Sequence, residues 1–219
     1  MTKNTITGIF KMEDVGELNP LLHVLEQLRV DHTKNDEILF HSGGPIGKTS
    51  RFSMIPVLDD LRVVFRQPDD NTAPTDRNPL IGELDLRLTP PVLLEFQVRS
   101  GAGWTTTRNE SHVSLEAALQ SVSELEVLGS VDPSSGLSPG GFVGVLGYDL
   151  GQWTSQMRMK NTPEHNEVLG VLWRTKGWII HDRKESSITT LGYSPMSAEE
   201  VRLSVCLLYT SPSPRDRSL

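Results

Sequence analysis

The chain has 219 residues, of which 28 are acidic and 21 are basic, so its formal net charge is −7. A chain of this length can bury most of its apolar surface, and its 37% apolar composition is typical of a folded protein. The acidic balance argues against a nucleic-acid partner, which needs a concentrated basic face. No apolar segment approaches the roughly 20 residues that cross a bilayer, and the start of the chain lacks a signal-peptide core. We therefore expect a cytoplasmic protein without membrane association.

The C-terminal segment 206–219 differs from the rest of the chain. Residues 206–216 have the sequence CLLYTSPSPRD, which resembles, codon for codon, the conceptual translation of a transposase sequencing adapter. We therefore expect the natural protein to continue beyond Val205, and we exclude this tail from the fold. The single cysteine, Cys206, belongs to the tail, so the natural part offers no disulfide or thiol chemistry.

Helix signals occur at three places. An Asn-Pro pair followed by leucines at helical spacing predicts a helix over residues 20–29. Ser114 can cap a second helix, and Ser197 with Glu200 forms a capping box for a third. The apolar residues expected to line the buried face of the second helix are Leu115, Ala118, Leu119, Val122 and Leu125.

Strand signals are more numerous than helix signals. Alternating or β-branched apolar residues predict strands over residues 36–42, 51–65, 84–89, 92–98, 168–182 and 187–191. Pro56 prevents a continuous helix in the second of these stretches. Residues 69–82 are polar and rich in turn formers, which predicts a surface loop, and a polar turn around Arg183 and Lys184 joins the last two strands. We expect an α+β domain over residues 1–205, dominated by antiparallel sheet.

Two glycine-rich segments suggest ligand binding at first sight. Residues 42–49, SGGPIGKT, resemble a phosphate-binding loop, but Ser42 stands where the first glycine is required and a strand-like segment follows Lys48. Spaced glycines in residues 140–151, GGFVGVLGYDLG, lack the dinucleotide-binding spacing. They indicate a strand that another backbone, or a ligand, approaches closely.

The histidines and tryptophans offer few chemical candidates. None of the six histidines has another histidine three or four positions away, so we expect no metal site in this chain. His41 deserves separate consideration, because it ends an apolar strand beside Ser42; a hydrogen-bonded edge histidine is the alternative. Trp153, Trp173 and Trp178 either stack on a ligand or belong to the core. No catalytic triad or carboxylate pair is evident.

Two blocks of the sequence resemble the N-terminal domain of a known family. They are LFHSGGPIGKTSRFSMI at 39–55 and SPGGFVGVLGYDLGQW at 138–153. Together they resemble the chorismate-utilising synthases, which comprise anthranilate synthase component I and aminodeoxychorismate synthase component I. The resemblance covers essentially all of residues 10–205 and implies half of an antiparallel β-sandwich with helices outside. His41 and the GYDLG segment are similar to the folate branch, that is, to aminodeoxychorismate synthase.

The resemblance also implies an activity for the whole enzyme. A glutamine amidotransferase subunit would deliver ammonia, which is added to chorismate with the help of Mg²⁺, giving 4-amino-4-deoxychorismate for folate biosynthesis. The chorismate and Mg²⁺ sites would lie in a C-terminal half beyond this chain. We therefore assign no catalytic residue and expect the chain alone to be inactive. The alternatives are an anthranilate synthase fragment of tryptophan biosynthesis and a noncatalytic small-molecule-binding module.

What this chain would carry, by the resemblance, is a pocket for tryptophan. The residues mapped to this pocket are Leu39, Phe40, His41, Ser42, Ser50, Arg51 and Phe52. The residues mapped to the structural glycine block are Gly141, Gly144, Gly147, Tyr148 and Asp149. Physically, Ser42 and nearby backbone could fix the zwitterion while Leu39 and Phe52 supply apolar walls. Histidine at position 41 removes the anionic partner that the glutamate of the tryptophan branch offers.

Overall fold

The structure is a computed structural model. It describes residues 8–11, 20–31, 37–47, 50–68, 91–101, 103–126, 136–153, 164–194, 196, 200, 201 and 203. The surface loop predicted at 69–82, the strand predicted at 84–89, the capping residue Ser197 and the tail 206–219 lie outside the described residues.

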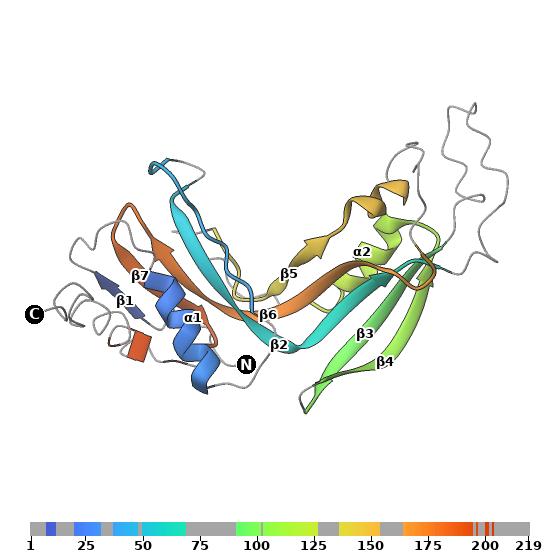
Figure 1. Ribbon diagram of the computed structural model, residues 1–219, viewed down its shortest axis with the longest axis horizontal. Coiled ribbons are helices and arrows are strands. Elements are labelled where there is room, and N and C mark those ends of the chain that lie inside the picture. The colour runs from blue at the N-terminus through green and yellow to red at the C-terminus, as the bar shows by residue number, and fades with distance from the viewer. Residues whose placement is uncertain are drawn as a thin grey trace, which may run out of the picture. The chain divides into compact units, whose positions relative to one another are not determined.

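The described elements confirm an α+β fold. In chain order they are β1 (Gly8–Lys11), α1 (Pro20–Asp31), β2 (Phe52–Arg66), β3 (Val92–Ser100), β4 (Gly103–His112), α2 (Leu115–Ser123), β5 (Gly141–Leu146), the 3-10 helix η2 (Tyr148–Trp153), β6 (Val168–Asp182) and β7 (Ser187–Gly192). The strands form one sheet in the order β1-β7-β6-β2-β3-β4, and β5 also pairs with β6 (Figure 1). The pairs β1–β7, β2–β3, β3–β4 and β6–β7 are antiparallel.

The chain divides into two compact units. The first unit comprises Met1–Val57, Leu128–Gly140 and Thr175–Leu219, and the second comprises Leu58–Val127 and Gly141–Arg174. The boundaries at residues 57 and 174 fall inside β2 and β6, so each of these long strands belongs to both units. The division therefore does not follow a single linker in the sequence.

The core of the first unit forms between α1 and the strands β2, β6 and β7. Leu21 and Val24 of α1 are fully buried, and they cluster with Ile55, Ile179 and Ile188. The helical spacing of apolar residues after Pro20 directs one face of α1 to this sheet. The predicted helix is confirmed and extends to Asp31.

The core of the second unit forms under α2. Val63, Phe65 and Phe96 are buried with the helix residues Leu115, Ala118 and Val122. The hydroxyl of Ser114 accepts the backbone N–H of Ala117 at 3.1 Å, which confirms the predicted N-cap. Leu119 was expected on the buried face but is 37% exposed, so that prediction is wrong. The nine-residue helix buries a narrow stripe, and Leu119 lies at its margin.

The strands agree with the sequence patterns only in part. β6 has the predicted bounds of 168 and 182, and β7 and β3 lie where strands were expected. The strand expected at 36–42 is reduced to an isolated bridge in which Phe40 pairs with Met54. β1 and β4 were not predicted. β4 carries mostly exposed polar residues and therefore lacks the apolar alternation that marks a half-buried strand.

Pro56 lies inside β2 without interrupting it. The N–H of Met54 donates to Phe40 O at 2.8 Å, and N–H groups two residues apart point to the same edge of a strand. The N–H that Pro56 lacks would therefore point to the Phe40 side of β2. Pairing with β6 on the opposite edge loses no hydrogen bond. Among the described residues, no helix is both long enough and apolar enough to cross a membrane.

Candidate functional site

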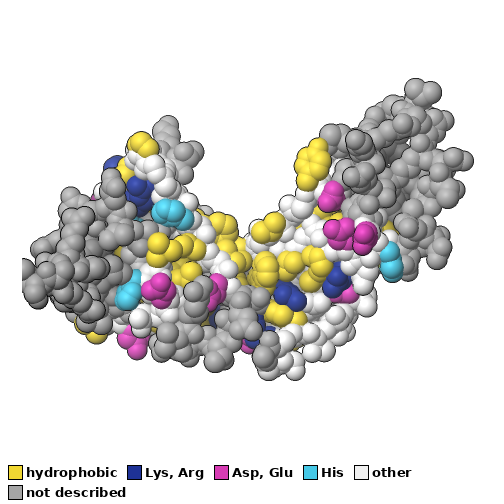
Figure 2. Space-filling view, viewed as in Figure 1, with side chains coloured by type: hydrophobic (Ala, Val, Ile, Leu, Met, Phe, Trp, Pro, Cys, Tyr) yellow, Lys and Arg dark blue, Asp and Glu magenta, His cyan; other side chains and the backbone are white. Residues whose placement is uncertain are grey.

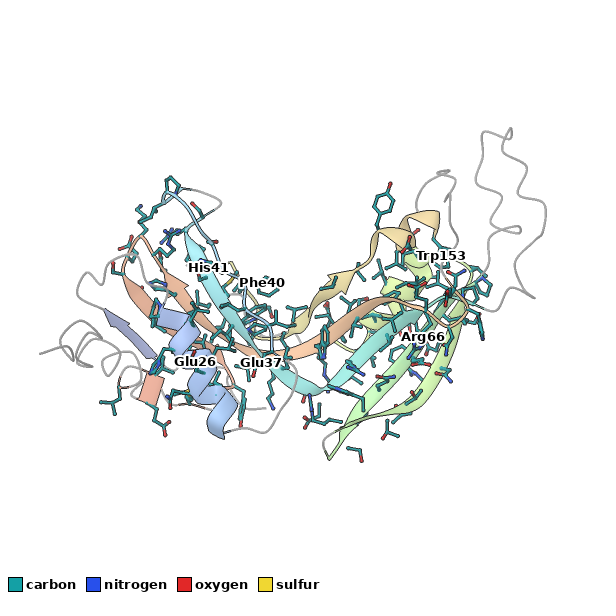
Figure 3. The ribbon with its side chains drawn as sticks, viewed as in Figure 1. Glu26, Glu37, Phe40, His41, Arg66 and Trp153 are labelled. Carbon is teal, nitrogen blue, oxygen red and sulfur yellow. The ribbon has the colours of Figure 1, made fainter. Side chains whose placement is uncertain are left out.

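The two halves of the first family-like block lie against each other in the first unit. Phe40 and Met54 exchange two backbone hydrogen bonds, of 2.9 and 2.8 Å. This bridge places residues 39–42 along the edge of β2, next to the Ser-Arg-Phe segment at 50–52. Figure 3 shows Phe40 and His41 on this arm beside β2. The structure thus brings the two segments 39–42 and 50–52 together, but Leu39 packs against the core while Phe40 is partly exposed.

Apolar residues of this arm alternate between the core and the surface. Leu39 packs against the core cluster of the first unit. Phe40 is 39% exposed, and its ring centroid lies 6.4 Å from that of Trp178. Trp178 is itself buried, and its indole Nε1 donates to Ser138 O at 2.8 Å. Trp178 and Trp153 are therefore core residues, and Phe40 is the one of these three aromatic residues that offers an open surface.

Ser53 fixes the position of His41 and Ser42. Its side chain is fully buried, and its Oγ accepts the backbone N–H of Ser42 at 3.2 Å. The same oxygen lies 3.5 Å from Nδ1 of the exposed His41. Ser53 was not among the predicted site residues, because a serine inside an apolar strand gives no signal in the sequence.

His181 belongs to β6, which pairs with the edge of β2 opposite to residues 39–42. The backbone N–H of Arg183 donates to Arg51 O, and that of Gln67 donates to Glu167 O. Both bonds fit one antiparallel register of β2 and β6, in which His181 is opposite Ser53. His181 is 8% exposed, and its Nδ1 has no hydrogen-bond partner within the described part of the chain. Burial lowers the pKa of His181, the positive charge of Arg183 lowers it further, and Asp182 opposes both effects.

Arg51 is bound by Asp182 at the end of β6. Its Nε donates to the two carboxylate oxygens at 2.9 and 3.0 Å, and its Nη2 also donates to Oδ2. The guanidinium carbon lies 4.7 Å from the ring centroid of Phe52. Asp182 Oδ1 additionally accepts the backbone N–H groups of Lys184 and Glu185. Arg51 is therefore committed to protein partners, although sequence alone placed it among ligand contacts.

These contacts lower the pKa of Asp182. Burial by itself would raise that pKa, but hydrogen bonds from Arg51 and from the backbone of Glu185 and Lys184 outweigh it. The carboxylate in turn raises the pKa of Arg51. Figure 2 shows Lys or Arg side chains (dark blue) near one histidine side chain (cyan) in the upper left part of the view.

The lowered pKa gives a prediction for acid unfolding. Because the folded-state pKa of Asp182 lies below its unfolded value of 3.8, its contribution to stability is present above pH 3.8. That contribution is lost as the pH falls through the folded pKa. We expect Asp182→Asn to flatten the pH dependence of the unfolding free energy below pH 3.8, measured by urea titration. A wild-type slope in the variant would contradict the assignment.

Arg183 joins both ends of the segment 42–50, which we call the 42–50 loop. Its Nη1 donates to Ser42 O at 3.0 Å and to Ser50 O at 2.9 Å, and its Nη2 donates to Gly44 O at 2.9 Å. The loop is not followed by a helix, since residue 50 is in a bend and β2 starts at Phe52. The helix that a phosphate-binding loop requires is therefore absent; Lys48 and Thr49 lie outside the described residues.

The glycine block lies in the second unit and has a packing role. A Cβ on Gly144 would lie 1.9 Å from Val171 O, and one on Gly147 would lie 2.7 Å from Leu169 O. The N–H of Gly147 donates to Leu169 O at 2.7 Å. The close backbone approach predicted from the glycine spacing is therefore present. Gly141 starts β5 with φ of +129°, and Tyr148 and Asp149 open η2, where Tyr148 is 73% exposed.

Metal ligands do not gather in the described part of the chain. No group of three or more histidine, cysteine, aspartate or glutamate side chains suited to a metal ion lies together there. Comparison with known proteins adds no assignment: no family model matches the sequence, and no curated protein matches it significantly.

Proposed function

We propose that the chain is the N-terminal part of aminodeoxychorismate synthase component I, a cytoplasmic enzyme of folate biosynthesis. The observation that carries this proposal is the contact between residues 39–42 and residues 50–54. Ser42 and Phe52 are ten positions apart in the sequence, and the Phe40–Met54 bridge and the bond from Ser42 to Ser53 hold the two motif segments together. A shared pocket requires such an arrangement.

The chemistry of the enzyme would belong to the part that follows this chain. There chorismate would accept ammonia from a glutamine amidotransferase subunit, and Mg²⁺ would neutralise the substrate carboxylate. The described residues of this chain offer no cluster of metal ligands. We propose that the role of this chain is to bind an aromatic amino acid, tryptophan, as an effector or structural ligand.

The pocket fits an aromatic ligand in two respects. Phe40 presents part of its ring to solvent next to Trp178, which provides a surface for an indole. Ser42 is half-buried beside it and offers a hydroxyl group. Arg51 is bound to Asp182, so the carboxylate of the ligand would have to use other donors.

The activity is tested with the product of the uninterrupted reading frame. Incubation with chorismate, ammonium and Mg²⁺ should give 4-amino-4-deoxychorismate without release of pyruvate. Anthranilate with pyruvate would assign the protein to the tryptophan branch instead. No product, together with no tryptophan binding, would contradict membership of the family.

The pocket is tested by substitution of Ser42. We expect Ser42→Phe in the full-length protein to weaken tryptophan binding by at least about a hundredfold, because the phenyl ring would occupy the space beside Phe40. Calorimetry measures the dissociation constant. Ser123→Phe, on the exposed end of α2, is the matched control and should bind normally. Unchanged affinity in Ser42→Phe would remove the pocket from this arm.

A further inference from the structure

We infer that Arg183 is a positioning residue of the effector pocket, which sets ligand affinity by holding the 42–50 loop against the sheet. This inference rests on the proposed function, because the ligand is the one proposed there. Arg183 lies outside both family-like blocks, in the turn between β6 and β7. It touches no pocket side chain in the contacts described above and acts on the backbone alone.

The contacts of Arg183 span the whole loop. Its guanidinium donates to the carbonyl oxygens of Ser42, Gly44 and Ser50, at 2.9 to 3.0 Å. Its backbone N–H donates to Arg51 O at 2.9 Å, which fixes the Cα of Arg183 beside the start of β2. The backbone of Arg183 is therefore held in place, and its planar guanidinium binds the loop at its beginning and at its end. A flexible ammonium group could not reproduce this fork.

Apart from the hydrogen bond from the N–H of Ser42 to Ser53 Oγ, the described residues of the loop, 42–47 and 50, have few other means of holding its shape. Gly43, Gly44 and Gly47 have wide conformational freedom, and Gly44 adopts a φ of +78°. Ile46 is 56% exposed and so does not anchor the loop in the core. The hydrogen bonds of Ser50 to Pro45 O and to Gly47 O are internal to the loop and do not attach it to the sheet. Attachment to β6 is therefore supplied by Arg183.

Asp182 holds the adjacent part of the pocket. Asp182 binds the guanidinium of Arg51, while the guanidinium of Arg183 binds the carbonyl oxygens of Ser42 and Ser50. Asp182, the last residue of β6, and Arg183, the first of the turn that follows, thus order Ser42, Ser50 and Arg51. The backbone N–H groups of Lys184 and Glu185 donate to Asp182, so the turn itself is fixed by the same carboxylate. Asp182 therefore stabilises both the β6–β7 turn and the position of Arg51.

Preorganisation explains why loss of Arg183 should reduce affinity. Without Arg183 the loop, which contains three glycines, would sample many conformations. The ligand would then bind only the fraction of molecules whose loop has the binding-competent conformation. The apparent dissociation constant rises in inverse proportion to the fraction of competent molecules. The ligand would lose no direct contact with Arg183, yet its affinity would fall.

The experiment compares variants of the full-length protein. We expect Arg183→Gln to raise the tryptophan dissociation constant, measured by calorimetry, by about tenfold or more. Amide hydrogen exchange in residues 42–50 should accelerate in the same variant. Arg183→Lys keeps the charge without the fork and should weaken binding to an intermediate degree, which separates geometry from charge.

Arg174, an arginine within β6, provides the matched control. Arg174 donates to Asp59 Oδ2 at 2.9 and 2.6 Å and to Leu125 O at 3.4 Å, all within the second unit. Arg174→Gln removes a comparable set of contacts and should leave tryptophan affinity and loop exchange unchanged.

The outcomes separate this inference from the proposed function. Weaker binding with faster loop exchange in Arg183→Gln, and neither in Arg174→Gln, supports the positioning role. Wild-type affinity in a folded Arg183→Gln protein overturns that role and leaves the pocket intact. A wild-type protein that does not bind tryptophan overturns the proposed ligand and this inference together.

Discussion

Gly144→Ala is expected to destabilise the second unit more than any other single methyl addition considered. A Cβ at this position would lie 1.9 Å from Val171 O and 2.9 Å from the Cα of Leu172. These are backbone atoms of β6, so no side-chain rotation relieves the clash. β5 would have to move away from β6, with a loss of about 3 kcal/mol or more in unfolding free energy. For a domain of marginal stability this is a large fraction of the total.

The control for this substitution is Gly103→Ala at the start of β4. No atom lies within 4 Å of a Cβ built there, so the added methyl group meets open space. We expect a neutral effect or a gain of about 0.5 kcal/mol, since alanine restricts the unfolded chain more than glycine. Urea midpoints from tryptophan fluorescence measure both variants. Equal midpoints for Gly144→Ala and the wild type would show that β5 does not pack against β6 as described.

The parts of the fold that the sequence predicts are those with a strong local pattern. β6 is a strand of 15 residues with apolar segments at 168–173 and 178–180, and its bounds agree with the prediction. α2 begins at a serine cap with apolar residues at helical spacing, and both features are present. β4 was missed because its sequence, GWTTTRNESH, is exposed along most of its length and need not alternate. Its position depends on pairing with β3, which is a tertiary property.

The residues of the candidate site were likewise predicted only in part. The arm residues 39–42 and 50–52 are close in sequence, so a motif can mark them together. Asp182 and Arg183 act on this arm from more than 130 positions away. A polar turn was predicted around Arg183, but nothing in a turn indicates which carbonyls an arginine will reach. The sequence predicts the pocket segments and leaves out the residues that hold them.

His181 gives the second large prediction, because it is a buried histidine whose Nδ1 lacks a hydrogen-bond partner among the described residues. Its pKa is lowered from 6.5 in the folded protein, first by burial and then by Arg183, while Asp182 acts in the opposite sense. Between the folded pKa and 6.5 the unfolded chain binds more protons than the folded one. Stability therefore rises with pH in that window, by at most about 1.4 kcal/mol per pH unit for one proton.

We expect His181→Leu to remove this slope and to raise the unfolding free energy at pH 7. The leucine leaves no buried nitrogen without a partner, and such a group costs about 1 to 3 kcal/mol. His165→Gln, at an exposed position of the second unit, should keep the wild-type slope. Urea titrations between pH 5 and pH 8 measure all three proteins. The pH dependence that Asp182 gives to stability lies below pH 3.8 and does not overlap this range. If the pH dependence of the unfolding free energy persists in His181→Leu, the titrating group is another residue. If His181→Leu is less stable than the wild type, Nδ1 of His181 has a hydrogen-bond partner in solution.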